Sequence, residues 1–254
     1  QLVTIGGAAF QSSGLTSITL PASLTSLGGG SFYECSYLTS VSFESGSQLT
    51  TIGYHAFDES GLTSITLPAS VILLASSTFY KCSYFTSINF ENGSQLKYIG
   101  SNCFTQSGLS GSITIPSSVE YIDQSAFNYI SINNFSISFE SDSLLTTINY
   151  NNFSNSTKLT SISIPPKVET LGNNIFKKCS NLTEVTFETG SRLTTVGNSV
   201  FQDSGLSNLT APQHVLGLLS NASGTYSGVN EDNLTITVDP DTTIVAPIPS
   251  YSAP

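Results

Sequence analysis

Short segments of alternating hydrophobic and polar residues recur along almost the whole chain. LTSITLPASLTSL at residues 15–27 returns as LTSITLPASVILL at residues 62–74, a shift of 47 residues. The first half of each segment alternates apolar and polar side chains, which predicts a half-buried β-strand. The second half spaces its apolar residues by three and four, which predicts a short helical or 3₁₀ stretch.

A second type of segment alternates with the first and divides the period into two coils. LTSVSFESGSQLTTIG at residues 38–53 returns as FTSINFENGSQLKYIG at residues 85–100 and as LTEVTFETGSRLTTVG at residues 182–197. One Phe closes almost every coil, at intervals of 22 to 26 residues. These anchors are Phe10, Phe32, Phe57, Phe79, Phe104, Phe127, Phe153, Phe176 and Phe201. Such a period is the signature of a solenoid, in which each coil buries its apolar face against its neighbours.

The repeat predicts both the fold and its boundaries. Over residues 1–219 we expect an α/β leucine-rich-repeat solenoid of about ten coils, with one parallel β-sheet and short helical or 3₁₀ segments on the other side. The Phe anchor is missing after Leu218, so residues 220–240 are expected to form an irregular cap, with a last strand at residues 233–240. Residues 241–254 are rich in Pro, Thr and Ser and predict an extended linker.

The repeat resembles the BspA-like, or TpLRR, class of leucine-rich repeats. The resemblance rests on the I-x-[LI]-P strand end, the I-G-x-x-A-F stretch at residues 52–57 and a Phe-x-x-Cys step, and it extends from Gln1 to about Pro212. It implies a solenoid fold and a surface protein of oral bacteria or mucosal parasites. It also implies adhesion to host matrix proteins, host cells or other microbes, although the motif residues themselves all build the core.

The charge of the chain argues against two classes of partner. Lys and Arg number 7 against 17 Asp and Glu, so the net charge is -10. Nucleic acid binding needs a basic surface that so few scattered cations cannot supply, and anionic membrane surfaces are disfavoured for the same reason. No apolar run reaches the ~20 residues that span a bilayer, so membrane contact is expected only through an anchor outside this sequence. A basic partner would gain in association rate.

The two ends of the sequence suggest a longer natural protein. The chain opens inside a coil and contains 0 Met, so we expect it to continue upstream. The Pro-rich end is compatible with a stalk that leads to a membrane anchor. Together with the family resemblance, these features favour an extracellular location, on the cell surface or secreted.

Neither a catalytic nor a metal-binding constellation is recognisable in the sequence. His55 and His214 lie far apart, and the chain has no nucleophile elbow, phosphate loop or zinc-ligand spacing. We therefore expect no enzyme activity, no cofactor and no metal. A column of acids recurs after alternate strands, at Glu44, Glu91, Glu140 and Glu188. Its members would lie roughly 10 Å apart, which favours solvated turn acids over a shared Ca²⁺ site.

The four Cys residues are expected to be buried, free thiols. Cys35, Cys82 and Cys179 share one slot of the repeat, and neighbours two coils apart exceed the Cα separation of about 7 Å that a disulfide spans. Cys103 falls in a column otherwise occupied by Ala, where a small thiol fits. A Cys82–Cys103 bridge between neighbouring coils stays open as an alternative.

Two surfaces are candidates for binding a partner. Outward positions of the predicted sheet form a row of hydroxyl and amide side chains that includes Thr19, Thr66, Asn89 and Thr114. A flank near the anchor Phe residues carries Tyr33, Tyr37, Tyr80 and Tyr84. A buried Tyr removes a large apolar area and keeps a polar handle, whereas hydroxyls only exchange water for partner hydrogen bonds. The Tyr flank is therefore the favoured surface.

These features favour a non-enzymatic adhesion domain that binds a surface or matrix protein of a host cell or microbe. The alternative is a structural spacer that projects another domain and has no ligand of its own. An ice-binding surface is a weaker hypothesis, because Ser42, Asn89 and Glu184 interrupt the rows of Thr and Ser. Candidate glycosylation sites lie in Asn-x-Ser/Thr sequons at Asn92, Asn221 and Asn233.

Overall fold

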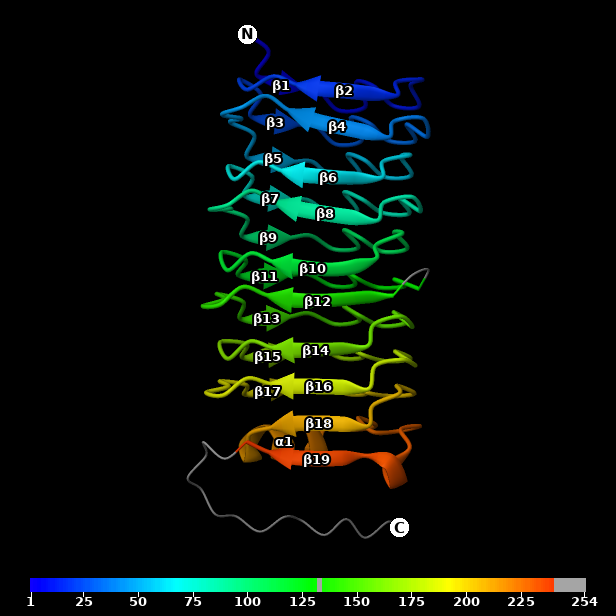
Figure 1. Ribbon diagram of the computed structural model, residues 1–254, viewed down its shortest axis with the longest axis vertical. Coiled ribbons are helices and arrows are strands. Elements are labelled where there is room, and N and C mark those ends of the chain that lie inside the picture. Colours follow the sequence, from blue (N-terminus) through cyan, green and yellow to red (C-terminus); the bar gives the residue numbers. More distant parts are fainter. Residues whose placement is uncertain (132–133, 240–254) are drawn as a thin grey trace.

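The chain winds into a rod of stacked coils. The computed structural model describes residues 1–131 and 134–239, with the first coil at one end of the rod and the last at the other (Figure 1). Each coil places one strand of four or five residues on the same long side. These strands are β2 (Ser17–Leu20), β4 (Ser40–Phe43), β6 (Ser64–Leu67), β8 (Ser87–Phe90), β10 (Gly111–Ile115), β12 (Phe135–Phe139), β14 (Ser161–Ile164), β16 (Glu184–Phe187), β18 (Asn208–Ala211) and β19 (Thr235–Val238).

The strands of this long side run parallel, with equivalent repeat positions side by side. They form three hydrogen-bonded sheets along the rod, in the orders β2-β4-β6-β8, β10-β12 and β14-β16-β18-β19. The register places Thr19 beside Ser42 and Thr66 beside Asn89. The predicted leucine-rich-repeat solenoid with parallel strands is therefore confirmed.

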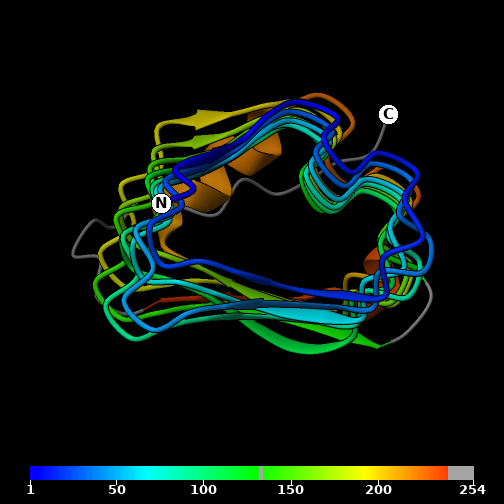
Figure 2. The ribbon, with the colours of Figure 1, turned by 90° about the horizontal axis from the view of Figure 1, so that it is seen from above.

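The opposite side of the rod carries strands of only two residues, one in every coil except the last. Nine such strands form one parallel sheet, which faces the long strands across the core in the view along the rod (Figure 2). They are β1 (Thr4–Ile5), β3 (Ser26–Leu27), β5 (Thr51–Ile52), β7 (Leu73–Leu74), β9 (Tyr98–Ile99), β11 (Tyr121–Ile122), β13 (Thr147–Ile148), β15 (Thr170–Leu171) and β17 (Thr195–Val196).

The structure corrects the helical or 3₁₀ stretch that was expected in each of these coils. A chain of turns follows the two-residue strand, and in one coil the amides of His55, Phe57 and Glu59 donate to carbonyls of the next coil. His55 and Glu59 both have a φ of 53°. Residues in this left-handed region aim alternate amides out of the coil, whereas an α-helix bonds every amide four residues back. Apolar residues three and four positions apart therefore belong here to a short strand and the turn that follows it, and not to a helix.

The anchor Phe rings form a continuous stack through the core. Centroids of successive rings from Phe10 to Phe201 lie 5.0–5.6 Å apart. The rings from Phe32 onward are fully buried. Burying one such side chain stabilises the fold by about 1.5–3 kcal/mol, and each favourable ring pair adds about 0.5–1.5 kcal/mol. Stacking of identical positions therefore stabilises the contact between successive coils.

The last coil departs from the repeat but keeps its ring position. Helix α1 (Gln213–Asn221) follows β18 and crosses the expected boundary at residue 219, and the 3₁₀ helix η1 (Glu231–Asn233) precedes β19. The anchor thought to be missing after Leu218 is Tyr226, which stacks on Phe201. Strand β19 pairs with β18 and lies within the strand predicted at residues 233–240. The expected linker at residues 241–254 lies outside the described residues.

Candidate functional site

Exposed Tyr side chains gather on one side of the rod, over the turns that contain the anchor Phe residues. We call this side the turn flank, and we call residues 28–37, 53–61 and 76–84 its Tyr-bearing part. Tyr129 and Tyr150 are also exposed, in the turns of Phe127 and Phe153. Tyr37 is 67% exposed, Tyr54 64% and Tyr84 68%. Tyr33 and Tyr80 are half-buried. The turn flank therefore brings the four predicted Tyr candidates together and adds Tyr54, which the candidate set left out.

Loop length explains why two of these Tyr side chains project into solvent. The chain has one more residue between Phe32 and Leu38 than between Phe57 and Leu62. In the shorter loop, a Cβ on Gly61 would collide with the carbonyl oxygen of Ser36. The short loop therefore packs closely against its neighbour, and the longer loop bulges outward. Tyr37 occupies that bulge, and Tyr84 occupies the equivalent bulge two coils later.

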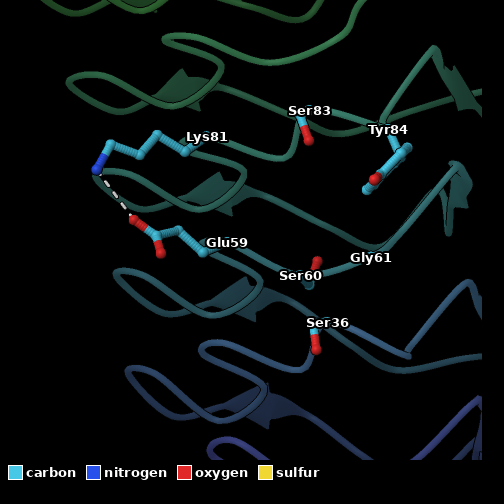
Figure 3. Close-up of a pocket in the computed structure, with 7 residues that line it drawn as sticks. All are labelled: Ser36, Glu59, Ser60, Gly61, Lys81, Ser83 and Tyr84. Carbon is cyan, nitrogen blue, oxygen red and sulfur yellow. Dashed lines mark hydrogen bonds and ion pairs between the residues drawn. The ribbon is translucent and has the colours of Figure 1, made fainter.

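A shallow hollow of about 320 Å³ lies beside Tyr84 on the turn flank (Figure 3). Glu59 and Lys81 form one wall, and their carboxylate and ammonium groups lie 3.0 Å apart. The Lys81 ammonium also lies 5.2 Å from the ring centroid of Tyr80. The remaining lining residues are Ser36, Ser60, Gly61 and Ser83. The hollow thus offers an aromatic side chain, one cation and hydroxyl groups to a partner.

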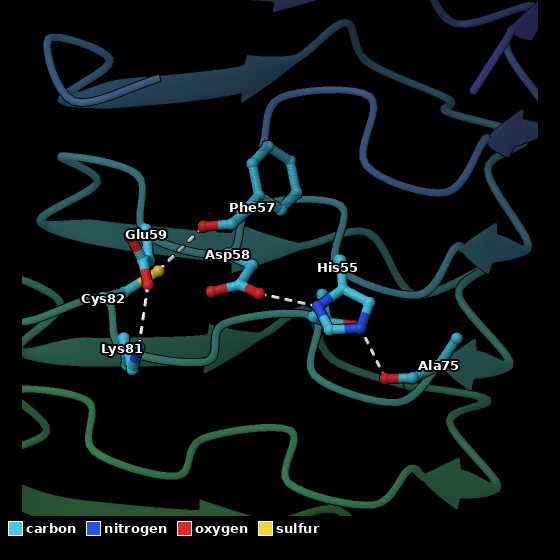
Figure 4. Close-up of polar contacts among 8 residues, drawn as sticks. His55, Phe57, Asp58, Glu59, Ala75, Lys81 and Cys82 are labelled. Atoms are coloured by element: carbon cyan, nitrogen blue, oxygen red, sulfur yellow. Dashed lines mark hydrogen bonds and ion pairs between the residues drawn. The ribbon is translucent and has the colours of Figure 1, made fainter. Parts of the chain in front are cut away.

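His55 has an acidic partner that the sequence reading did not recognise. Its Nδ1 lies 2.6 Å from Oδ2 of Asp58, which is buried beneath the turn flank, and the two face each other in Figure 4. Burial raises the pKa of Asp58, although the hydrogen bond from His55 opposes the shift. The Oδ1 atom of Asp58 has no hydrogen-bond partner among the described residues. Tyr33 and Tyr54 both place their rings edge-on to His55, so the pair supports the aromatic part of the flank.

The candidate residues of the sheet row are exposed, and two of the four already have a hydrogen-bond partner in the next coil. Thr19, Thr66, Asn89 and Thr114 all face solvent from the long strands. The hydroxyls of Thr19 and Ser42 lie 2.8 Å apart, and those of Thr114 and Ser138 lie 3.1 Å apart. A hydroxyl already paired across the coils gains little by exchanging that partner for a ligand. The sheet row is therefore the weaker of the two predicted surfaces.

The Cys residues take part in the internal hydrogen bonding of the coils. All four are free and buried, in agreement with the predicted thiols. The thiols of Cys35, Cys82 and Cys179 donate to the anchor carbonyl of the preceding coil at 2.9–3.0 Å. Burial raises the pKa of Cys82 and of Cys179 to about 12. These groups are therefore structural and do not form a reactive site.

The recurring Glu column closes the turns between coils. The carboxylates of Glu44 and Glu91 accept the backbone amides of Ala22 and Ala69 at 2.9 and 3.0 Å. Glu140 does the same for Ser117 at 2.8 Å, whereas Glu188 accepts a side-chain hydroxyl. These contacts give the column a structural role. The described residues hold no group of three or more His, Cys, Asp or Glu placed to bind a metal ion.

A polar cluster on the two-residue strands was not anticipated. Asp123 accepts the hydroxyl hydrogens of Tyr98 and Ser101, the side-chain amide of Asn149 and the backbone amide of Gln124. Burial favours a higher pKa for Asp123, but these hydrogen bonds outweigh it and the pKa is lowered. The signal in the sequence is that Asp123 and Asn149 stand where other coils carry Gly. Because the carboxylate is fully engaged, the cluster is structural.

The three candidate glycosylation sites are exposed. Asn92 lies in a turn after β8, Asn221 is the last residue of α1 and Asn233 is the last residue of η1. Among the described residues, neither α1 nor η1 has the length and apolar character that crossing a bilayer requires.

The repeat and its fold place the chain among leucine-rich-repeat proteins, and comparison with known proteins identifies the family. Residues 3–133 and 97–223 match the BspA type leucine rich repeat region, in 6 copies. The chain belongs to this family.

Solved structures of bacterial proteins share the architecture. The pneumococcal vaccine antigen PcpA is 17% identical to this chain, with a TM-score of 0.50. The match covers 93% of this chain and 84% of the PcpA chain. A leucine rich cell surface protein from Faecalibacterium prausnitzii is 16% identical over 95% of this chain and 84% of its own, with a TM-score of 0.42. The leucine-rich repeat protein of T. pallidum is 20% identical over 79% and 69%, with a TM-score of 0.37. No curated protein matches this chain.

Proposed function

We propose that this chain is a non-enzymatic protein-binding domain of a cell-surface or secreted protein, which attaches a microbe or parasite to a host cell or its matrix. The observation that carries the proposal is the group of exposed Tyr side chains on the turn flank, beside the hollow of Figure 3. Membership of the BspA-type family supports it, and so does the shared fold of PcpA, a vaccine antigen.

The physical reason lies in the area that Tyr side chains can bury. Tyr37 and Tyr84 expose about two thirds of their surface on the bulges of the longer loops. A partner that covers them removes apolar area from water and can pair with the hydroxyl, as Tyr residues do at interface hot spots. We expect a single domain to bind with roughly micromolar affinity, and many copies on a surface to supply avidity.

Adhesion of coated beads to host cells and to matrix proteins tests the proposal. One variant carries Tyr37→Ser and Tyr84→Ser, and it should reduce adhesion by about tenfold, because truncating two hot spots costs at least about 1.4 kcal/mol. A control variant with Ile236→Ser and Val238→Ser removes comparable exposed apolar groups from β19, on the long-strand side of the rod, and should adhere normally. Thr19→Lys, Thr66→Lys and Thr114→Lys together alter the sheet row and should also leave adhesion intact.

The outcomes separate three functions. Loss of adhesion in the sheet variant, with adhesion retained in the Tyr variant, would move the binding site to the sheet row. If parent beads adhere no better than beads that carry an unrelated repeat protein, the adhesion function is wrong and the spacer function is favoured.

A further inference from the structure

The turn flank changes its chemistry along the rod. In the repeat, Lys177 follows its anchor Phe176 by one residue and Lys178 by two, as Tyr80 and Lys81 follow Phe79. Lys158 follows Phe153 by five residues, as Tyr84 follows Phe79. Three Lys side chains therefore occupy, toward the C-terminal end, positions whose equivalents carry Tyr80, Lys81 and Tyr84 nearer the N-terminal end.

Within the part of the chain that the structure describes, none of these three cations is paired with an acidic side chain. The ion pairs of the described residues join His55 to Asp58, Lys81 to Glu59 and Lys97 to Glu120. Lys178 is exposed, and Lys158 and Lys177 are half-exposed. Asp203 stands one coil after Lys178 at the equivalent position, but the two form no ion pair. In a chain of net charge -10, this gathers three of the seven cations on one part of one side.

We infer that the partner of the turn flank is a protein that places an acidic segment on Lys158, Lys177 and Lys178 while another part of it covers Tyr37 and Tyr84. The inference rests on the proposed function and specifies the partner. Tyr37 lies in the coil of Phe32 and Lys177 in the coil of Phe176, six coils further on, which is about 30 Å at the spacing of parallel strands. A contact strip of this length is the size of an ordinary protein interface, in which charge complementarity sets register and association rate.

The surroundings of the Lys cluster favour an acidic protein segment over an anionic polysaccharide. A polyanion needs an extended cationic track, but the flank carries Asp203 beyond the cluster and Glu59 and Glu34 in its Tyr-bearing part. The net charge of -10 repels a long polyanion as a whole. A protein can present acids opposite the Lys cluster and neutral groups opposite the Tyr residues. The net charge alone favoured a basic partner, whereas the local positive charge of the Lys cluster favours an acidic one.

Carbodiimide cross-linking to an acidic peptide tests the charge preference without any knowledge of the natural partner. The probe is a twelve-residue peptide of alternating Glu and Ser, and the linked Lys residues are mapped by mass spectrometry. We expect linkage at Lys158, Lys177 and Lys178 to exceed linkage at Lys167, which lies off the flank, by about fivefold, because the local potential concentrates the peptide there. Equal linkage at Lys167 would overturn the inference. Competition by heparin stronger than by the unlabelled peptide would also overturn it, in favour of a polysaccharide.

Bead adhesion tests the same cluster in the proposed function. Lys158→Gln, Lys177→Gln and Lys178→Gln together should lower adhesion by about tenfold and reduce its salt dependence. The matched control, Lys97→Gln, Lys167→Gln and Arg192→Gln, changes the net charge equally and should adhere as the parent does. Normal adhesion of the cluster variant, with adhesion lost in the Tyr variant, would overturn the inference and leave the proposed function standing. If parent beads do not adhere, the proposed function fails and the cross-linking alone decides the charge preference.

Discussion

The ring of Tyr226 stacks on the ring of Phe201, with centroids 5.9 Å apart and planes 25° apart. Tyr226 thereby takes the tenth position in a stack that begins at Phe10. Unlike the rings from Phe32 to Phe201, Tyr226 is only half-buried. The last coil therefore continues the stack with a Tyr ring in place of Phe.

Truncation of the stack should cost more in its middle than at this end. Phe104→Ala removes a fully buried ring with a neighbour on each side, and we expect it to lower the free energy of unfolding by about 3–5 kcal/mol. Tyr226→Ala should cost about half as much or less, because this ring is only half-buried and removes less apolar area from water. Urea denaturation followed by circular dichroism measures both, and equal losses would contradict the stacking account.

Two Gly residues at equivalent repeat positions should respond differently to the same substitution. A Cβ on Gly61 collides with the carbonyl oxygen of Ser36, whereas Gly14, in the first coil, has nothing within 4 Å. We expect Gly61→Ala to lower the free energy of unfolding by about 1–3 kcal/mol, and Gly14→Ala to leave it within about 1 kcal/mol. Chemical denaturation of the two variants checks this, and a Gly61→Ala variant as stable as the parent would show that the loops shift freely.

The four thiols should be unreactive until the chain unfolds. All are fully buried, and burial raises the pKa of Cys82 and Cys179 to about 12, so few thiolates exist at pH 8. A colorimetric thiol reagent should therefore react negligibly with the native protein and should find 4 thiols in denaturant without reductant. A count of two in denaturant would reveal a disulfide.

The stacking of coils could be predicted from the sequence because its determinants repeat. Every anchor Phe and strand position recurs with the same neighbours, so one period specifies all the others. The form of the turns could not be read from apolar spacing, because residues such as Leu24 and Leu27 face the core equally well from a short strand as from a helix. Tyr226 was not predicted as an anchor because its local sequence does not resemble the repeat. Only its position, eight coils after Phe32, marks it as a member of the stack.

The part of the candidate site that repeats could also be predicted from the sequence. The Tyr residues of the flank recur at fixed distances from an anchor, so their common side followed from the period. The pairing of His55 with Asp58 depends on a single coil, and no repeat of it marks the contact. The protrusion of Tyr37 depends on one extra residue in its loop and on the close approach at Gly61, which emerges only when neighbouring coils are stacked.

Two buried or half-buried carboxyls should give the stability opposite dependences on pH. The pKa of Asp123 is lowered in the folded chain, so its ionised form stabilises the fold above the unfolded pKa of about 3.9 and this contribution is lost as the pH falls. The pKa of Asp58 is raised by burial, so folding takes up a proton there. Its contribution is therefore greatest below about pH 3.9 and declines as the pH rises through the folded pKa.

Urea unfolding at a series of pH values between about 3 and 5.5, which brackets the unfolded carboxyl pKa, measures both effects. Relative to the parent, Asp123→Asn should become more destabilising as the pH rises, because only the ionised carboxylate gains from the hydrogen bonds of Tyr98 and Ser101. Asp58→Asn should become less destabilising over the same range, because it removes a carboxylate that burial makes costly to ionise. If the change in unfolding free energy has the same pH dependence in both variants, the two carboxyls do not have the opposite pKa shifts that their contacts indicate.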